Sequence, residues 1–126
     1  RSVDQFLQRA PVVSWNAEGT SRYTLLMVDP DAPDREGDGS RAAQFGPWLH
    51  WLVVDCAGDA ASGVTKQAYM GPAPPKGKHR YLLLLFEQTA GTPAVASVDR
   101  MRWDIAGFLK NPVKPVAATF FYCSAQ

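Results

Sequence analysis

Two carboxylates and two histidines are the groups in this chain of 126 residues whose types and spacing could do chemistry. Asp29 and Asp31 stand in the segment VDPDAPDRE, and residues two apart in an extended chain point to the same face. Pro30 and Pro33 fix the backbone around them. Because Asp-Pro pairs also start turns, the segment is interpreted either as an ordinary turn or as a rigid rim that carries two carboxylates.

The two histidines lie in different segments. His50 stands inside the apolar run WLHWLVVD, and His79 joins the stiff loop GPAPPKGK to the apolar run RYLLLLF. Each also has a plain interpretation, His50 as a hydrogen-bonded core residue and His79 as an exposed loop residue. Beside carboxylates, imidazoles could instead donate hydrogen bonds to an anion, act as acid–base groups or hold a divalent metal. The sequence has no Gly-x-Ser-x-Gly nucleophile element and no His-x-x-x-His pair, which favours binding over catalysis.

Four short runs rich in β-branched, aromatic and aliphatic residues are predicted to be the strands that position these side chains. They are 22–29, 48–55, 80–88 and 117–124, with 11–15 as a weaker candidate. Three of the runs are apolar on both faces, which indicates strands buried between two layers. The sequence shows no βαβ alternation, so a mainly β, antiparallel sandwich is favoured over a doubly wound fold.

One helix is predicted over 97–111, packed outside the strands. Ser97 or Asp99 would cap its start, and Pro112 would end it. The N-terminal segment 2–10 is interpreted as a second short helix or as a loop, and the polar segment 34–46 as a linker or as a loop that builds a site. The apolar stripe of the predicted helix consists of Val98, Met101, Ile105 and Phe108 or Leu109.

Composition narrows the class of protein. The length and an apolar fraction of 46% suit one globular domain. A net charge of +1 gives no general attraction to nucleic acid or to an anionic membrane. Cys56 and Cys123 share no short motif and are predicted to be free and reduced rather than paired. The chain begins with Arg1, which is interpreted as the start of a fragment or of a processed protein.

Three segments in order carry a resemblance to a known family. They are DPDAP at 29–33, WLHWLVV at 48–54 and YMGPAPPKGKHRYLLLLFEQ at 69–88. Through them the chain resembles the phosphatidylethanolamine-binding protein family, which includes the Raf kinase inhibitor protein and the plant flowering regulators. PVVSW at 11–15 and PVAATFFYCSAQ at 115–126 extend the resemblance along the chain. Three motifs in order are far more specific than one short pattern.

The resemblance implies a Greek-key sandwich of two antiparallel sheets with one or two peripheral helices. It implies a single domain over 1–126, in which the N-terminal strands of the family are either lacking or not included in this sequence. The implied function is non-enzymatic: a pocket at the sheet edge takes the phosphate of a phosphatidylethanolamine-type head group or another small anion, with no metal and no cofactor. The implied pocket residues are Asp29, Asp31, Ala32, Pro33, Trp48, His50, Ala73, Pro74, Pro75, His79 and Tyr81.

The resemblance also implies protein partners at the pocket rim and allows peripheral contact with a membrane, without direct binding of nucleic acid. A cytoplasmic location is expected, with a mitochondrial one as the alternative. One competing function is an enzyme or metal site built from Asp29, His50 and His79. The other is a structural subunit of a larger assembly, such as a mitochondrial ribosome, in which this fold has been recruited. The retained pocket motifs favour binding and regulation over a purely architectural role.

Overall fold

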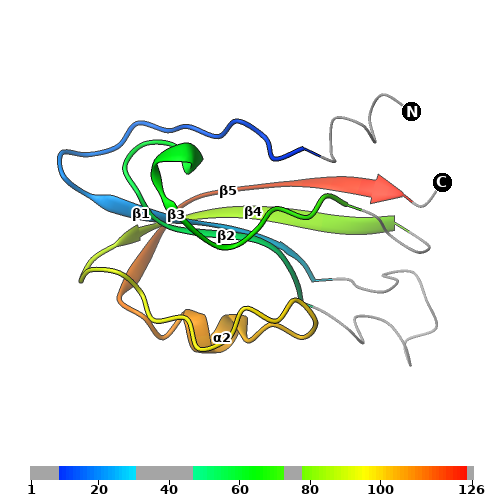
Figure 1. Ribbon diagram of the computed structural model, residues 1–126. Helices are drawn as coiled ribbons and strands as arrows, with labels where there is room; N and C mark the ends of the chain where they lie inside the picture. Colours follow the sequence, from blue (N-terminus) through cyan, green and yellow to red (C-terminus); the bar gives the residue numbers. More distant parts are fainter. Residues whose placement is uncertain (1–8, 31–46, 73–77, 125–126) are drawn as a thin grey trace.

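The computed structural model describes residues 9–30, 47–72 and 78–124, with the side chains of 78–79 and 122–124 left undescribed. Within these ranges five strands form one antiparallel sheet in the order β3-β2-β1-β4-β5 (Figure 1). Two short helices lie outside it. The elements are β1 (Arg22–Asp29), β2 (Trp48–Cys56), the 3-10 helix η1 (Ala60–Ser62), β3 (Val64–Gln67), β4 (Lys78–Gln88), α2 (Ile105–Phe108) and β5 (Val113–Ser124).

The strand order is that of a Greek key. Strands β1, β2 and β3 are successive antiparallel neighbours, and β4 returns by a longer connection to pair with the other side of β1. The four predicted strands and the mainly β, Greek-key fold with a peripheral helix are confirmed. The described residues form one sheet, and segment 11–15 contributes only an isolated bridge between Ser14 and Asp59. The prediction missed β3, a short strand whose residues are mostly exposed.

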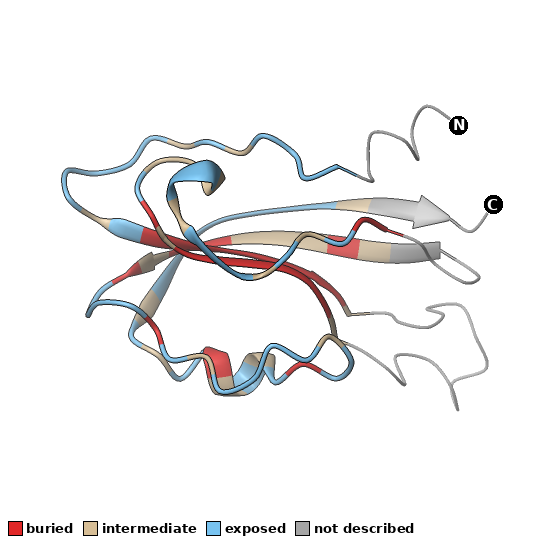
Figure 2. Ribbon diagram, in the orientation of Figure 1, coloured by how far each residue is buried: buried red, intermediate tan, exposed pale blue. Residues whose placement is uncertain are grey.

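The core lies on both faces of the central strand β1, in which every residue after Arg22 is buried. One face carries a cluster that includes Met27, Trp51 and Tyr81, and segment 9–21 and η1 lie over it (Figure 1). The other face carries a cluster that includes Val28 and Phe108, beneath the layer that holds α2. Figure 2 shows that burial is concentrated on β1 and β2. The prediction of strands buried between two layers is therefore confirmed.

The predicted helix over 97–111 is wrong except for one turn, because only Ile105–Phe108 is α-helical. The backbone that precedes this helical turn is hydrogen-bonded to β2 and to Pro47, which precedes β2. The Leu49 amide donates to the Arg100 carbonyl at 2.8 Å, and the Trp103 amide donates to the Pro47 carbonyl at 2.9 Å. These tertiary bonds replace the local bonds that a helix would make. Arg102 has a φ of 52°, in the left-handed region, which a right-handed helix excludes.

Neither predicted cap nor the predicted stripe is found. Asp104 caps the short helix, since its Oδ1 accepts from the Gly107 amide at 2.9 Å. In the stripe, Val98, Met101 and Leu109 expose 36%, 47% and 48% of their surface, whereas Phe108 is buried. The periodicity therefore described residues that point in different directions.

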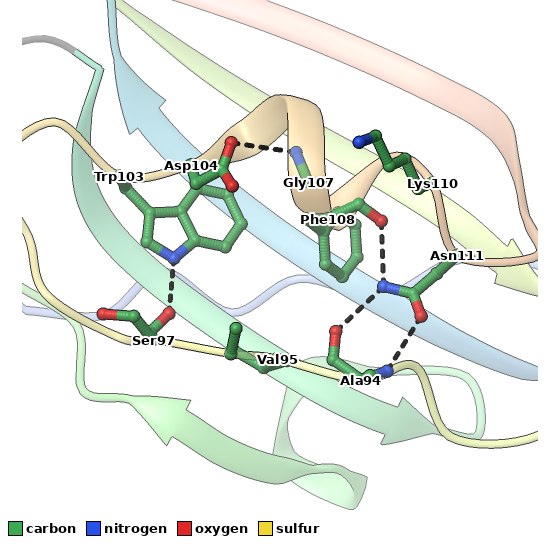
Figure 3. Close-up of a pocket in the computed structure, with 10 residues that line it drawn as sticks. Ala94, Val95, Ser97, Trp103, Asp104, Gly107, Phe108, Lys110 and Asn111 are labelled. Carbon is green, nitrogen blue, oxygen red and sulfur yellow. Dashed lines mark hydrogen bonds between the residues drawn. The ribbon is translucent and has the colours of Figure 1, made fainter.

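Asn111 holds the outer layer together (Figure 3). Its side-chain Oδ1 accepts from the Ala94 amide at 2.9 Å, and its Nδ2 donates to the carbonyls of Ala94 at 2.8 Å and Phe108 at 2.9 Å. Nearby, Trp103 Nε1 donates to the Ser97 carbonyl at 2.7 Å. The residues that make these bonds line a hollow of about 410 Å³ between segment 94–97 and α2. They tie a segment with little regular structure to α2, whose Phe108 is packed against the sheet.

Replacing Asn111 by alanine is expected to lower the free energy of unfolding by about 1–3 kcal/mol, because three hydrogen bonds are lost and the backbone groups that formed them are left without that partner. Urea unfolding followed by circular dichroism measures the change. Replacement of the exposed neighbour Lys110 by alanine is the control, with an expected change below about 0.5 kcal/mol. Equal stability of the two variants would contradict the role given to Asn111.

Cys56 is a free cysteine with a fully buried side chain, as predicted for a reduced thiol. Burial, with smaller effects of Asp59 and Asp55, raises the pKa of its thiol to about 11. The thiol therefore stays protonated and poorly reactive at neutral pH. The side chain of Cys123 lies outside the described residues.

Candidate functional site

The candidate site lies where β1 ends and β2 begins. Asp29, the last residue of β1, pairs directly with Trp48, the first residue of β2. Because Val28 pairs with Leu82, the antiparallel register brings Tyr81 of β4 to the level of Asp29. Asp29 exposes 3% of its surface and Tyr81 exposes 1%, so polar groups are buried at this end of the sheet.

His50 occupies a β-bulge in β2. The register pairs Met27 with Trp51 and Val28 with Leu49, which leaves His50 as an extra residue. A bulge re-aims side chains relative to regular alternation. Here the His50 ring contacts the Tyr81 ring edge-on, with centroids 5.2 Å apart. The bulge thus turns His50 towards the face of the sheet that carries Tyr81 and Trp51.

Asp29 and Trp48 belong to the same face. Met27 packs in the cluster that contains Tyr81, and residues two apart along a strand point the same way, so Asp29 follows Met27. Trp48 is the direct cross-strand neighbour of Asp29 and shares its face. One face at one sheet end therefore carries a carboxylate, an imidazole, a phenol and an indole.

The hydrogen bond of His50 fixes the proton on one ring nitrogen. His50 Nδ1 lies 2.5 Å from the Met70 carbonyl oxygen, and since a carbonyl only accepts, Nδ1 must donate. Nε2 is then an acceptor in the neutral ring and a donor in the protonated ring. The Met70 amide also donates to the His50 carbonyl at 2.9 Å. Two bonds thus tie His50 to segment 68–72.

Arg100 holds these segments together from the far end of the chain. Its Nη1 donates to the carbonyls of Leu49 at 2.9 Å and His50 at 3.1 Å. Its Nη2 donates to Gln67 Oε1 and to the Ala68 carbonyl, each at 2.9 Å. Partial burial lowers the pKa of the guanidinium from its ordinary value. Sequence reasoning missed Arg100, because main-chain carbonyls leave no pattern in a sequence.

The aromatic rings of the site extend into the edge of the sheet. Tyr81 stacks on Phe121 of β5, with centroids 5.4 Å apart and an interplanar angle of 19°. Such a pair holds the ring of Tyr81 in one orientation and contributes about 0.5–1.5 kcal/mol beyond its buried area. Strands β2, β1, β4 and β5 thus each contribute to the site or its support.

A family model described as phosphatidylethanolamine-binding protein matches residues 5–121. This chain belongs to the phosphatidylethanolamine-binding protein family. The match covers most of the chain, and it includes every strand of the sheet in whole or in part.

Known members of the family show how far the likeness extends. The rice protein named MOTHER of FT and TFL1 homolog 2 is 43% identical over 82 residues, which are 64% of this chain and 44% of that protein. A 26 kDa secreted antigen of Toxocara canis is 40% identical over 83 residues, 64% of this chain and 30% of that protein. The chain thus spans less than half the length of these curated relatives.

Solved structures agree with the fold. A carboxypeptidase Y inhibitor, complexed with its cognate proteinase, matches with a TM-score of 0.73 and 23% identity, over 98% of this chain and 74% of that one. A phosphatidylethanolamine-binding protein from Plasmodium vivax matches with a TM-score of 0.65 and 21% identity, over 95% and 74% of the two chains. At these identities the likeness establishes the fold alone.

The structure places four of the predicted phosphatidylethanolamine-binding residues on one face at one sheet end: Asp29, Trp48, His50 and Tyr81. The backbone of His79 lies in β4, opposite Cys123, and its side chain is not among those described. That these residues bind a ligand stays a prediction. The predicted residues outside the described ranges are Asp31, Ala32, Pro33, Ala73, Pro74 and Pro75.

The described ranges contain no group of three or more histidine, cysteine, aspartate or glutamate side chains placed to hold a metal ion. They also contain no helix long and apolar enough to cross a membrane.

Proposed function

We propose that this chain is a non-enzymatic binding and regulatory module, whose site at the ends of β1, β2 and β4 takes a phosphate-type anion such as a phosphatidylethanolamine head group. The observation that carries the proposal is the buried His50 ring. Its Nδ1 is committed to the Met70 carbonyl, so a proton gained by the ring goes to Nε2 and creates a charged donor. Membership of the family supports a binding role in general.

A phosphate group and a buried carboxylate repel each other, so Asp29 needs a role other than direct contact. We propose that Asp29 orients and stabilises the donors around the anion, as a carboxylate that accepts from an imidazole or amide does. The donors in this proposal are His50, His79 and Tyr81, with backbone amides of the loop 71–78. Hydrogen bonds to a charged group contribute about 1.5–3 kcal/mol each, so several donors together oppose the repulsion from one carboxylate.

A protein partner at the rim is the second part of the proposal. The inhibitor structure with the same fold contains its cognate proteinase, so this fold can carry a surface for another protein. In this chain the rim would come from the loops beside the site, with the anion influencing their position.

Native mass spectrometry of the chain tests the proposal. After incubation with vesicles that contain phosphatidylethanolamine, the protein is expected to carry one lipid, and a variant with His50 replaced by alanine is expected to lose most of it. Absence of any lipid or small-anion adduct would overturn the proposal. Stoichiometric zinc in the same spectra, with a hydrolase activity that depends on His50, would instead establish the competing enzyme.

A further inference from the structure

A second hollow of about 440 Å³ lies on the face of the sheet that carries the proposed anion site, beneath the described N-terminal segment 9–21. Its walls come from residues 10–13, from η1 with the residues that flank it, and from β2, β3 and segment 68–69. Most described lining residues are small: alanine, proline, valine, glycine and threonine. The exceptions are Trp51, Tyr69 and Asp59, and none of the three belongs to the proposed anion site.

Trp51 and Tyr69 form an aromatic corner in this hollow. Their ring centroids are 5.3 Å apart, and their planes meet at 86°. Trp51 exposes only 6% of its surface, so β2 and the core hold it in place. Tyr69 is half-buried, and burial raises the pKa of its phenol. The attraction of a cation to an aromatic ring grows as water is excluded from the contact.

The described lining of this hollow carries negative charge only. Asp59 is the only charged residue in the described lining. Its Oδ1 accepts from the Ser62 amide at 2.9 Å and caps η1, whereas no described residue hydrogen-bonds to Oδ2. Lys66 follows the lining residue Thr65 in β3, and successive strand residues point to opposite faces, so its ammonium group is directed away.

We propose that this hollow binds a small, soluble organic cation that carries a methylated ammonium group. Both rings line the hollow, so an aromatic face there would attract such a group, and Asp59 supplies the compensating negative charge. An anion would meet the carboxylate with no basic residue in the described lining. A neutral apolar ligand would desolvate the carboxylate without compensating it, which is unfavourable.

Nuclear magnetic resonance titration of the chain with choline and with 3,3-dimethylbutan-1-ol tests the proposal, because the two probes share a shape and differ in charge. Choline is expected to bind at least about tenfold more tightly than the alcohol, a difference typical of a partly desolvated cation–aromatic contact. Its methyl resonance should move upfield, since the methyl groups lie over the rings. Equal binding of both probes, or no binding of either, would overturn the proposal.

Three variants at two positions locate the site. Asp59→Asn keeps an oxygen that can cap η1 and removes the charge. The affinity for choline should therefore fall by a factor of about five or more, whereas the affinity for the alcohol should not change. Tyr69→Leu should weaken choline binding, whereas Tyr69→Phe should retain it because the ring is kept. Unchanged choline binding by natively folded Asp59→Asn and Tyr69→Leu proteins would overturn the assignment. Binding of inorganic phosphate, measured in parallel, should be the same in Asp59→Asn as in the original chain.

Discussion

Replacing Arg100 by methionine is expected to lower the free energy of unfolding by about 2–4 kcal/mol and to weaken binding at the anion site about tenfold. The guanidinium donates to three main-chain carbonyls and to Gln67, so four acceptors lose a charged donor together. Methionine keeps part of the packing of the stem and removes the bonds. The loss of affinity follows because the carbonyls of Leu49 and His50 flank the bulge that directs the His50 ring.

Arg100→Lys separates charge from geometry. A lysine keeps the positive charge, but its single ammonium group lacks the planar fork that lets Arg100 reach acceptors on two segments at once. It should therefore recover less than half of the lost stability. Lys66→Met, on the exposed surface of neighbouring β3, is the control for loss of a charge and should change stability by less than about 0.5 kcal/mol.

Urea unfolding measures the stability of these variants, and calorimetric titration of the folded proteins measures their affinity for phosphate. A variant that merely unfolds more easily would keep the affinity of the original chain in conditions where it is fully folded. A positioning role requires that the folded Arg100→Met protein also binds more weakly. An unfolding midpoint of Arg100→Met equal to that of Lys66→Met would refute the role of this residue.

The sequence predicted four of the five strands of the described sheet because their signal is local. Strands β1 and β2 are buried on both faces, so they appear as mainly apolar runs. Strand β3 has the sequence VTKQ and exposed side chains, and nothing in such a segment distinguishes it from a loop. The predicted helix failed for a different reason: its backbone groups bond to β2 and the adjoining Pro47 across the fold, and helical periodicity does not report such bonds.

The candidate site could be predicted in composition but not in geometry. The motifs named Asp29, Trp48, His50 and Tyr81, and the structure gathers these four on one face. The bulge that directs His50 is an extra residue relative to β1, and a single strand's sequence does not show what it pairs with. Arg100 is 50 residues from His50 along the chain, and no motif connects them.

Replacing His50 by asparagine is expected to remove most of the pH dependence of anion binding while leaving the fold intact. The carboxamide nitrogen of asparagine can take the place of Nδ1 and keep the bond to the Met70 carbonyl, but it offers no group at the position of Nε2. In the original chain, affinity should fall about tenfold or more between about pH 5 and about pH 8. Histidine is the side chain whose ordinary change of charge falls between about pH 5 and about pH 8.

The sign follows from which form of His50 donates. Below its pKa the ring carries a proton on each nitrogen, and Nε2 can donate a charged hydrogen bond; above it, Nε2 only accepts and repels an anion. A phosphodiester such as glycerophosphoethanolamine suits calorimetry, because its phosphate keeps a single negative charge across the range and the protein alone titrates. Affinity of the original chain that is equal at both ends of the range would eliminate the protonated imidazole as the donor. A dependence that persists in full in His50→Asn would assign it instead to His79, the other histidine of the chain.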